Sequence, residues 1–261
     1  MSEASLHKLL TKSPEIARRR NHMNIPTLDA ITKFVRNSLY FFGTFAITYF
    51  KIILLINLVK ISEESKELKK EIGSLVEEKL REFKEMGKKG SEEWFNELCF
   101  CILTANYSAL GGLKIQREIG DGFLTLSEGE LKRRLRELGH RFPNKRAEYI
   151  VGARKHAKDL KGKVLSAKDP REWLVRNIKG IGYKEASHFL RNVGYEDYAI
   201  LDYHILDLLE KEGIIKRPRT LTRKKYLEIE GKLRKIARRL GMNLAELDLY
   251  LWYKETGKVL K

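Results

Sequence analysis

Two glycines, a lysine and an aspartate lie close together in residues 177–206 and suggest a reactive centre. Gly180 and Gly182 flank a single isoleucine, Lys184 follows two positions later, and Asp202 precedes an apolar helical pattern. Glycines permit a tight turn and the close approach of another backbone. A lysine amine attacks electrophilic carbon, and a carboxylate accepts protons or stabilises positive charge. The stretch therefore predicts a phosphate clamp beside an amine nucleophile and a carboxylate.

The glycine pair separates two helical patterns, residues 171–178 and a second pattern that begins near residue 183. The first turn of a helix presents N–H groups without partners, and these groups bind anions. A helix–turn–helix of this kind binds phosphate without reading sequence. A GxG alone is more often a simple turn. Together with the two helices and the basic composition, it favours contacts from Lys179, Gly180 and Gly182 to a nucleic-acid backbone.

Lys184 and Asp202 each have a structural interpretation beside the chemical one. Lys184 falls in the first turn of its helix, where the helix dipole disfavours a cation and so favours the neutral, nucleophilic amine. The alternative for Lys184 is an ordinary solvated surface charge. Asp202 is suited to cap the helix that it precedes, a role that is compatible with catalysis. His204, two residues further on, is expected to be a partly buried structural histidine, with a direct functional role as the alternative.

The chain is strongly basic. Its 261 residues have a formal net charge of +17, and 33% of them are charged. This favours a polyanionic partner, nucleic acid rather than an acidic membrane surface. A lysine-rich surface of a heat-adapted protein is compatible with that partner and fits the single glutamine, Gln116. Cys99 and Cys101 are too few for a four-cysteine metal site or a disulfide framework, so we expect no metal and an intracellular protein.

Residues 1–60 differ from the rest and are expected to form an N-terminal extension. Their apolar stretch, residues 39–59, is interrupted by Lys51. A membrane span needs about 20 apolar residues, and the longest uncharged run, residues 37–50, is shorter. Three interpretations remain: a hydrophobic helix packed on the domain, a poor membrane anchor, or an assigned start upstream of the true one. We do not expect the protein to act at a membrane.

Residues 61–261 show helical periodicity almost throughout. Glycines at 87 and 90 are expected to end a first helix, and Ser91 to cap a mostly apolar central helix at residues 94–106. Capping residues and apolar faces predict further helices near residues 131–138, 144–160, 171–178, 183–193, 202–209, 222–240 and 243–253. Alternating strand patterns are scarce. The body is therefore predicted to be an all-α domain, or two helical lobes.

Several motifs in a fixed order make residues 61–261 resemble a known family. They are residues 97–106, 120–125, 139–142, 145–150, the glycine–lysine stretch, and 246–253 with 257–261. The sequence resembles the helix-hairpin-helix DNA glycosylases, and among them the second, mostly archaeal, type of 8-oxoguanine DNA glycosylase/AP lyase. The resemblance implies two helical lobes around a DNA-binding cleft. The loop at residues 194–201 departs from the superfamily because it lacks the usual proline.

The resemblance implies a bifunctional, monomeric repair enzyme that acts on double-stranded DNA containing 8-oxoguanine, in the cytoplasm and without a cofactor. Lys184 would attack C1′ of the damaged nucleotide and expel the base, and β-elimination from the resulting Schiff base would nick the strand. Asp202 would assist deprotonation of Lys184 and stabilise positive charge on the sugar. The alternative is a non-catalytic helix-hairpin-helix module that only binds the DNA backbone.

The resemblance also implicates four residues in handling the extruded base. Asn106 matches a position that inserts a side chain into the duplex, and Phe142 an aromatic that contacts the stack around the orphaned base. Their structural alternatives are a helix C-cap for Asn106 and a core position for Phe142. Trp252 and Lys261 match residues that hold the oxidised guanine. A tag after Lys261 is therefore expected to harm base recognition.

Overall fold

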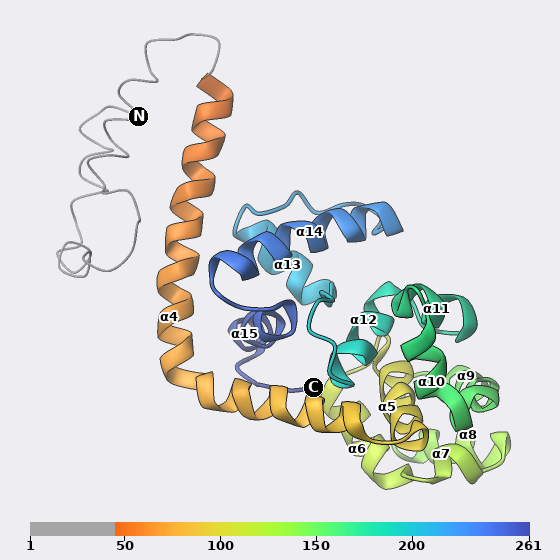
Figure 1. Cartoon of the computed structure of the whole chain (residues 1–261). Helices are drawn as coiled ribbons and strands as arrows, with labels where there is room; N and C mark the ends of the chain where they lie inside the picture. The colour runs from red at the N-terminus through yellow and green to blue at the C-terminus, as the bar shows by residue number, and fades with distance from the viewer. Residues whose placement is uncertain (1–44) are drawn as a thin grey trace. The chain divides into compact units, whose positions relative to one another are not determined.

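The computed structural model describes the backbone of residues 45–261 and the side chains of residues 67–261 (Figure 1). The chain divides into two compact units, residues 1–56 and residues 57–261. Three interpretations were given for residues 1–60: a packed extension, a membrane anchor or a misplaced start. The side chains of these residues lie outside the described part of the chain, so all three stay predictions. Among the described residues, no helix is long and apolar enough to cross a membrane.

Every regular element in residues 45–261 is helical, which confirms the predicted all-α class. In chain order the elements are α4 (Phe45–Lys88), α5 (Ser91–Thr104), α6 (Ala109–Ile119), α7 (Gly122–Thr125), α8 (Glu128–Glu137), α9 (Pro143–Ala153), the 3₁₀ helix η1 (Arg154–Asp159), α10 (Leu160–Ser166), α11 (Pro170–Asn177), α12 (Tyr183–Asn192), α13 (Tyr203–Lys211), α14 (Arg223–Arg239) and α15 (Leu244–Thr256).

The junction between α4 and α5 differs from the prediction in two respects. Gly87 does not end α4, which continues to Lys88. A Cβ at Gly87 would lie 2.6 Å from the carbonyl oxygen of Val193, so this glycine allows close packing against the end of α12. Ser91 does not cap α5, because Gly90 occupies the N-cap position. The Ser91 hydroxyl instead accepts the backbone N–H of Lys161 at 3.2 Å.

The helix predicted over residues 144–160 is also broken in the structure. The α-helix ends at Ala153 and is followed by η1 and α10. The break places Arg154 against the short helix α7, where its Nε donates to the carbonyl of Phe123 and its Nη2 to that of Leu126, both at 2.7 Å. These bonds join segments about 30 residues apart, so helical periodicity alone did not indicate the break.

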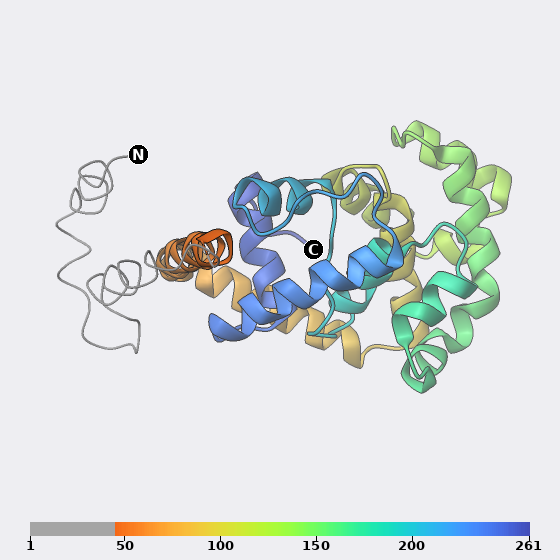
Figure 2. The same cartoon turned by 90° about the horizontal axis from the view of Figure 1, so that it is seen from above.

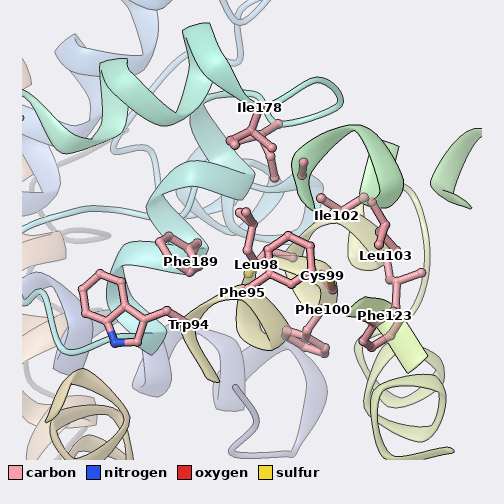
Figure 3. Packing of buried hydrophobic residues seen from close by; sticks show 14 of the residues in the cluster. Trp94, Phe95, Leu98, Cys99, Phe100, Ile102, Leu103, Phe123, Ile178 and Phe189 are labelled. Atoms are coloured by element: carbon pink, nitrogen blue, oxygen red, sulfur yellow. The ribbon is translucent and has the colours of Figure 1, made fainter. Parts of the chain in front are cut away.

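The described side chains form two hydrophobic cores, which agrees with the two predicted lobes. The first surrounds α5, and its edge-to-face pair of Trp94 and Phe189 has ring centroids 5.8 Å apart (Figure 3). The second is built from the C-terminal half of α4 with α13, α14 and α15. The same C-terminal helices, drawn in blue, form one group and the green α8–α11 helices form another in the overall views (Figure 2).

A buried ion pair joins the two lobes. Both terminal nitrogens of Arg171 in α11 donate to Glu230 in α14, at 2.5 and 3.1 Å, and the two side chains are 6% and 4% exposed. Glu230 also accepts the N–H of Ala199 at 3.1 Å, and the Tyr226 hydroxyl donates to the carbonyl of Ala199 at 2.6 Å. Hydrogen bonds from α14 therefore hold the proline-free loop that leads to Asp202.

Replacing Glu230 with alanine is expected to destabilise the fold strongly, because it leaves the Arg171 guanidinium buried without a counter-charge. Breaking a buried ion pair from one side typically costs about 3–5 kcal/mol. Chemical denaturation of Glu230→Ala should show a loss in this range. Glu228→Ala on the same helix is the control, because Glu228 pairs with Lys225 at the surface. Equal unfolding midpoints for the two variants would contradict the buried-pair argument.

Candidate active site

The hairpin between α11 and α12 requires glycine at only one of its two glycine positions. Gly180 has φ +87°, and a Cβ there would lie 2.2 Å from the Tyr149 ring. Gly182 has φ −98°, and its Cβ would meet only the flexible Glu185 carboxylate at 3.3 Å. The sequence prediction of a glycine-dependent turn therefore holds for Gly180, where the close neighbour is an aromatic ring rather than another backbone.

The start of α12 is already partly capped by the chain itself. The N–H of Gly182 donates to the Glu185 carboxylate at 3.3 Å, which occupies one donor of the predicted anion site. Lys179 is exposed at the hairpin, with its Nζ 2.7 Å from Glu148 Oε1 and 5.6 Å from the centre of the Tyr149 ring. The hydrogen bond to Glu148 raises the pKa of Lys179, which therefore stays protonated and suited to a phosphate.

Gly180→Ala is expected to distort the hairpin, whereas Gly182→Ala is the matched control. A non-glycine residue in the left-handed region typically costs about 1–3 kcal/mol, and the clash with Tyr149 adds to this. We expect Gly180→Ala to lower the melting temperature and to weaken DNA binding in fluorescence anisotropy. Gly182→Ala should lower the melting temperature much less. A Gly180→Ala variant that matches wild type in both measurements would show that the hairpin tolerates a side chain.

Four of the predicted site residues line one cavity, of about 80 Å³: Lys184, Asp202, Trp252 and Lys261. They come from α12, the start of α13, α15 and the segment that follows α15. The Lys184 side chain is 24% exposed, and its Nζ lies 3.2 Å from Glu185 Oε1. Asp202 is the N-cap of α13, as predicted, and its Oδ1 accepts the N–H of Ile205 at 2.8 Å. We call this cavity the candidate base pocket.

Buried charges that the sequence analysis did not single out lie beside these four residues. Asp248 of α15 lines the candidate base pocket and forms an ion pair with the guanidinium of Arg191. Burial raises the pKa of Asp248 to about 6, with the nearby charge of Asp202 adding to the effect and Arg191 opposing it. Arg191 also donates to Asn192 Oδ1, at 3.1 and 2.9 Å. A charged residue on an otherwise buried helix face was the available sequence signal.

Two histidines lie close to the candidate base pocket in different surroundings. His188 lines the pocket and is buried, with its ring 5.5 Å from that of Phe100 in an edge-to-face arrangement. Burial lowers the pKa of His188 well below its usual value, so its ring is neutral near pH 7. His204 is exposed, so the predicted partly buried position is wrong. Its ring contacts that of Trp252 edge-to-face, with centroids 5.5 Å apart.

Asn106 and Phe142 lie outside the candidate base pocket, on two loops. Asn106 is exposed, has φ +56°, and is the only non-glycine residue with positive φ in the described part of the chain. It is not the helix C-cap, because Ala105 occupies that position. Phe142 is 37% exposed, so its alternative as a core aromatic is wrong. The guanidinium of Arg141 lies 5.1 Å from the centre of the Phe142 ring.

A buried histidine holds these two loops together. The N–H of Phe142 donates to His140 Nδ1 at 2.9 Å, and His140 Nε2 lies 3.0 Å from the carbonyl of Leu103 at the end of α5. Since Nδ1 accepts, the tautomer inferred from these contacts is neutral with Nε2–H donating. Burial lowers the pKa of His140, which favours this state. The Tyr107 hydroxyl adds a bond to the carbonyl of Gly139 at 3.2 Å.

Two helical lobes with a helix–hairpin–helix placed beside their shared pocket are the architecture of the helix-hairpin-helix DNA glycosylases, and comparison with known proteins refines this class. A family model described as 8-oxoguanine DNA glycosylase matches residues 76–242. The 8-oxoguanine DNA glycosylase/AP lyase of Methanocaldococcus jannaschii is 58% identical over 207 residues, covering 78% of this chain and 99% of that protein. The chain belongs to the 8-oxoguanine DNA glycosylase family.

A second relative and a solved structure support the same family assignment. The 8-oxoguanine DNA glycosylase/AP lyase of Korarchaeum cryptofilum is 57% identical, covering 73% of this chain and 92% of that protein. The crystal structure of the Methanocaldococcus jannaschii 8-oxoguanine glycosylase/lyase in complex with a 15mer DNA containing 8-oxoguanine has a TM-score of 0.75 and 56% identity. It covers 77% of this chain and 100% of that chain. The predicted helix-hairpin-helix glycosylase fold is confirmed.

Proposed function

We propose that this protein removes 8-oxoguanine from double-stranded DNA and then nicks the strand by β-elimination through a lysine Schiff base. The observation that most directly supports this proposal is that Lys184 and Asp202, from two different helices, line one pocket together with Trp252. An amine and a carboxylate at one sugar suit covalent base excision. No cofactor takes part in this scheme, and the protein acts as a monomer in the cytoplasm, on chromosomal DNA.

Lys184 carries the covalent step. Its neutral amine attacks C1′ of the damaged nucleotide, and the glycosidic bond breaks as the base leaves with the bonding electron pair and takes up a proton. In the resulting N,O-acetal the C1′–O4′ bond then breaks, the oxygen takes up a proton and remains on C4′ as a hydroxyl, and C1′ becomes part of a protonated imine. This imine acidifies the C2′ proton, whose removal expels the 3′ phosphate and nicks the strand.

Asp202 supports this step in two ways. In the free protein the Lys184 ammonium is ion-paired with Glu185 at 3.2 Å, so the amine must leave that contact and lose a proton before it attacks. The Asp202 carboxylate is the proton acceptor, and its negative charge then stabilises the cation that develops on the sugar. Its Oδ1 accepts a hydrogen bond from α13, which fixes the orientation of the carboxylate.

The remaining predicted residues bind DNA and the extruded base. Lys179, Gly180 and Gly182 contact the backbone phosphates at the hairpin. Asn106 and Phe142, on loops that His140 holds together, contact the duplex at the vacated position. Trp252 stacks on the extruded base, and Lys261 lies at the same pocket.

Borohydride trapping tests the proposed function. The protein is mixed with a duplex containing 8-oxoguanine opposite cytosine, and the imine is reduced to a stable covalent bond. We expect a cross-linked protein–DNA band and release of the base, with neither from the same duplex containing guanine. Salt-sensitive DNA binding without base release or a trapped band would instead identify a non-catalytic helix-hairpin-helix module.

A further inference from the structure

The side chain of Lys261 is held in place, although it lies four residues beyond the left-handed residue Gly257 that ends α15. Chain ends beyond the last helix are ordinarily frayed. Lys261 Nζ instead donates to Glu97 Oε2 at 2.7 Å and to Gln116 Oε1 at 2.8 Å, and lies 4.6 Å from the centre of the Phe100 ring. Three contacts from α5 and α6 therefore fix this ammonium.

The buried carboxylate of Glu97 requires a counter-charge, and the Lys261 ammonium supplies it. The Glu97 side chain is 2% exposed on the central helix α5, and a carboxylate buried to this degree requires a counter-charge. Its Oε1 accepts from Asn192 Nδ2 at 2.6 Å, a neutral partner. Arg191, the next residue along, is ion-paired with Asp248 instead. Lys261 is the only cation within ion-pair distance of Glu97 in the described part of the chain.

Lys261 also lines two cavities of very different size. On one side it lines the candidate base pocket with Lys184 and Trp252. On the other side it lines an open cleft of about 940 Å³ between α5 and α6, together with Glu97 and Gln116. The described side chains leave this cleft open, so Lys261 has room to move away from the base pocket. The ion pair with Glu97 opposes that movement.

We infer that Glu97 is a positioning residue that holds Lys261 in the wall of the candidate base pocket, and that base excision depends on this contact. Glu97 acts through Lys261, with Gln116 as a second acceptor for the same ammonium. The inference rests on the proposed function for its catalytic consequence, whereas the anchoring itself is measurable without any reaction on DNA.

The first test measures anchoring through the reactivity of the Lys261 amine in the full chain. Wild type and Glu97→Gln are treated briefly with an acetylating reagent, and modification of each lysine is followed by peptide mass spectrometry. Lys258, exposed three residues earlier, is the internal reference. We expect Lys261 to react at least about fivefold faster relative to Lys258 in Glu97→Gln, because a charge-assisted hydrogen bond has been weakened. An unchanged ratio overturns the inference.

The second test separates positioning from a general loss of structure. Glu97→Gln is expected to reduce excision of 8-oxoguanine by about 10- to 100-fold, as misplacement of a distant group does. Nicking at a preformed abasic site, which offers no base to recognise, should stay within about twofold of wild type. Equal loss in both reactions would indicate a merely structural role and overturn the inference. Lys261→Met should reproduce the selective loss, and the double variant should be no worse.

The control is Glu92→Gln, because Glu92 lines the same cleft from the first turn of α5 but is exposed. It should match wild type in both tests. If Glu97→Gln does not fold, Glu97→Asp keeps the charge but withdraws the carboxylate from Lys261, and an unchanged Lys261 reactivity there overturns the inference. If wild type fails to excise 8-oxoguanine, the proposed function fails while the reactivity ratio still decides the anchoring.

Discussion

We expect Lys184→Ala to abolish the borohydride-trapped complex with 8-oxoguanine DNA. Schiff-base formation needs a primary amine at this position, and Lys184 is the lysine of α12 that lines the candidate base pocket beside Asp202. Removing a covalent nucleophile should lower nicking by a factor on the order of 10³ or more, equivalent to about 4 kcal/mol of transition-state stabilisation. Single-turnover nicking and trapping, both measured on denaturing gels, report the loss directly.

The same variant should still bind DNA, since the hairpin glycines and Lys179 are untouched. Lys132→Gln is the matched control, because it removes a lysine charge from the surface of α8, where Lys132 pairs with Glu128. It should trap as well as wild type. A Lys184→Ala protein that traps normally would assign the nucleophile to another amine and overturn the proposed mechanism.

Asp202→Asn should reduce excision by about 10²–10⁴-fold, the range typical of a lost general base, while leaving the fold intact. Asp202 has a structural role as well, since Oδ1 caps α13 through the N–H of Ile205 at 2.8 Å. Asparagine caps a helix about as well as aspartate, so this variant keeps the cap and removes only the charge. Single-turnover excision and thermal unfolding, measured side by side, separate the two roles.

Asp202→Ala loses both roles and should in addition be destabilised by about 1 kcal/mol, the usual cost of a lost N-cap. Asn243→Ala gives the reference for that cost, because Asn243 caps α15 by accepting the N–H of Glu246 at 2.8 Å. If Asp202→Asn kept wild-type excision, or if Asn243→Ala reduced excision equally, the aspartate would be a helix cap alone.

Helix positions were largely predictable because the signals that define them are local. The helices predicted near residues 131–138, 222–240 and 243–253 begin in the structure at local caps, namely the capping box of Ser127 and Glu130 and the N-caps Thr222 and Asn243. Each depends on residues within one helical turn. The errors have the opposite character. The Ser91 hydroxyl accepts the backbone N–H of Lys161, a residue 70 positions away, and no local pattern carries that information.

Exposure was predicted less well than helix position, since exposure depends on what packs against a residue. His204 was expected to be partly buried and is exposed, with its ring against that of Trp252 from another helix. Phe142 had a core position as its structural alternative, yet it is exposed at the surface. For His204 the neighbouring ring belongs to a residue that is distant in sequence, so no local pattern indicated the contact.

The sequence by itself determined the all-α class and the hairpin, and it singled out Lys184 and Asp202 as the candidate reactive pair, because periodicity, capping and residue chemistry act within a few residues. Only the tertiary structure decided what surrounds that pair. The contact of Arg191 with Asp248 spans 57 residues, and that of Glu97 with Lys261 spans 164. A buried charge without a partner is costly, so these ion pairs form between residues that only the folded chain brings together.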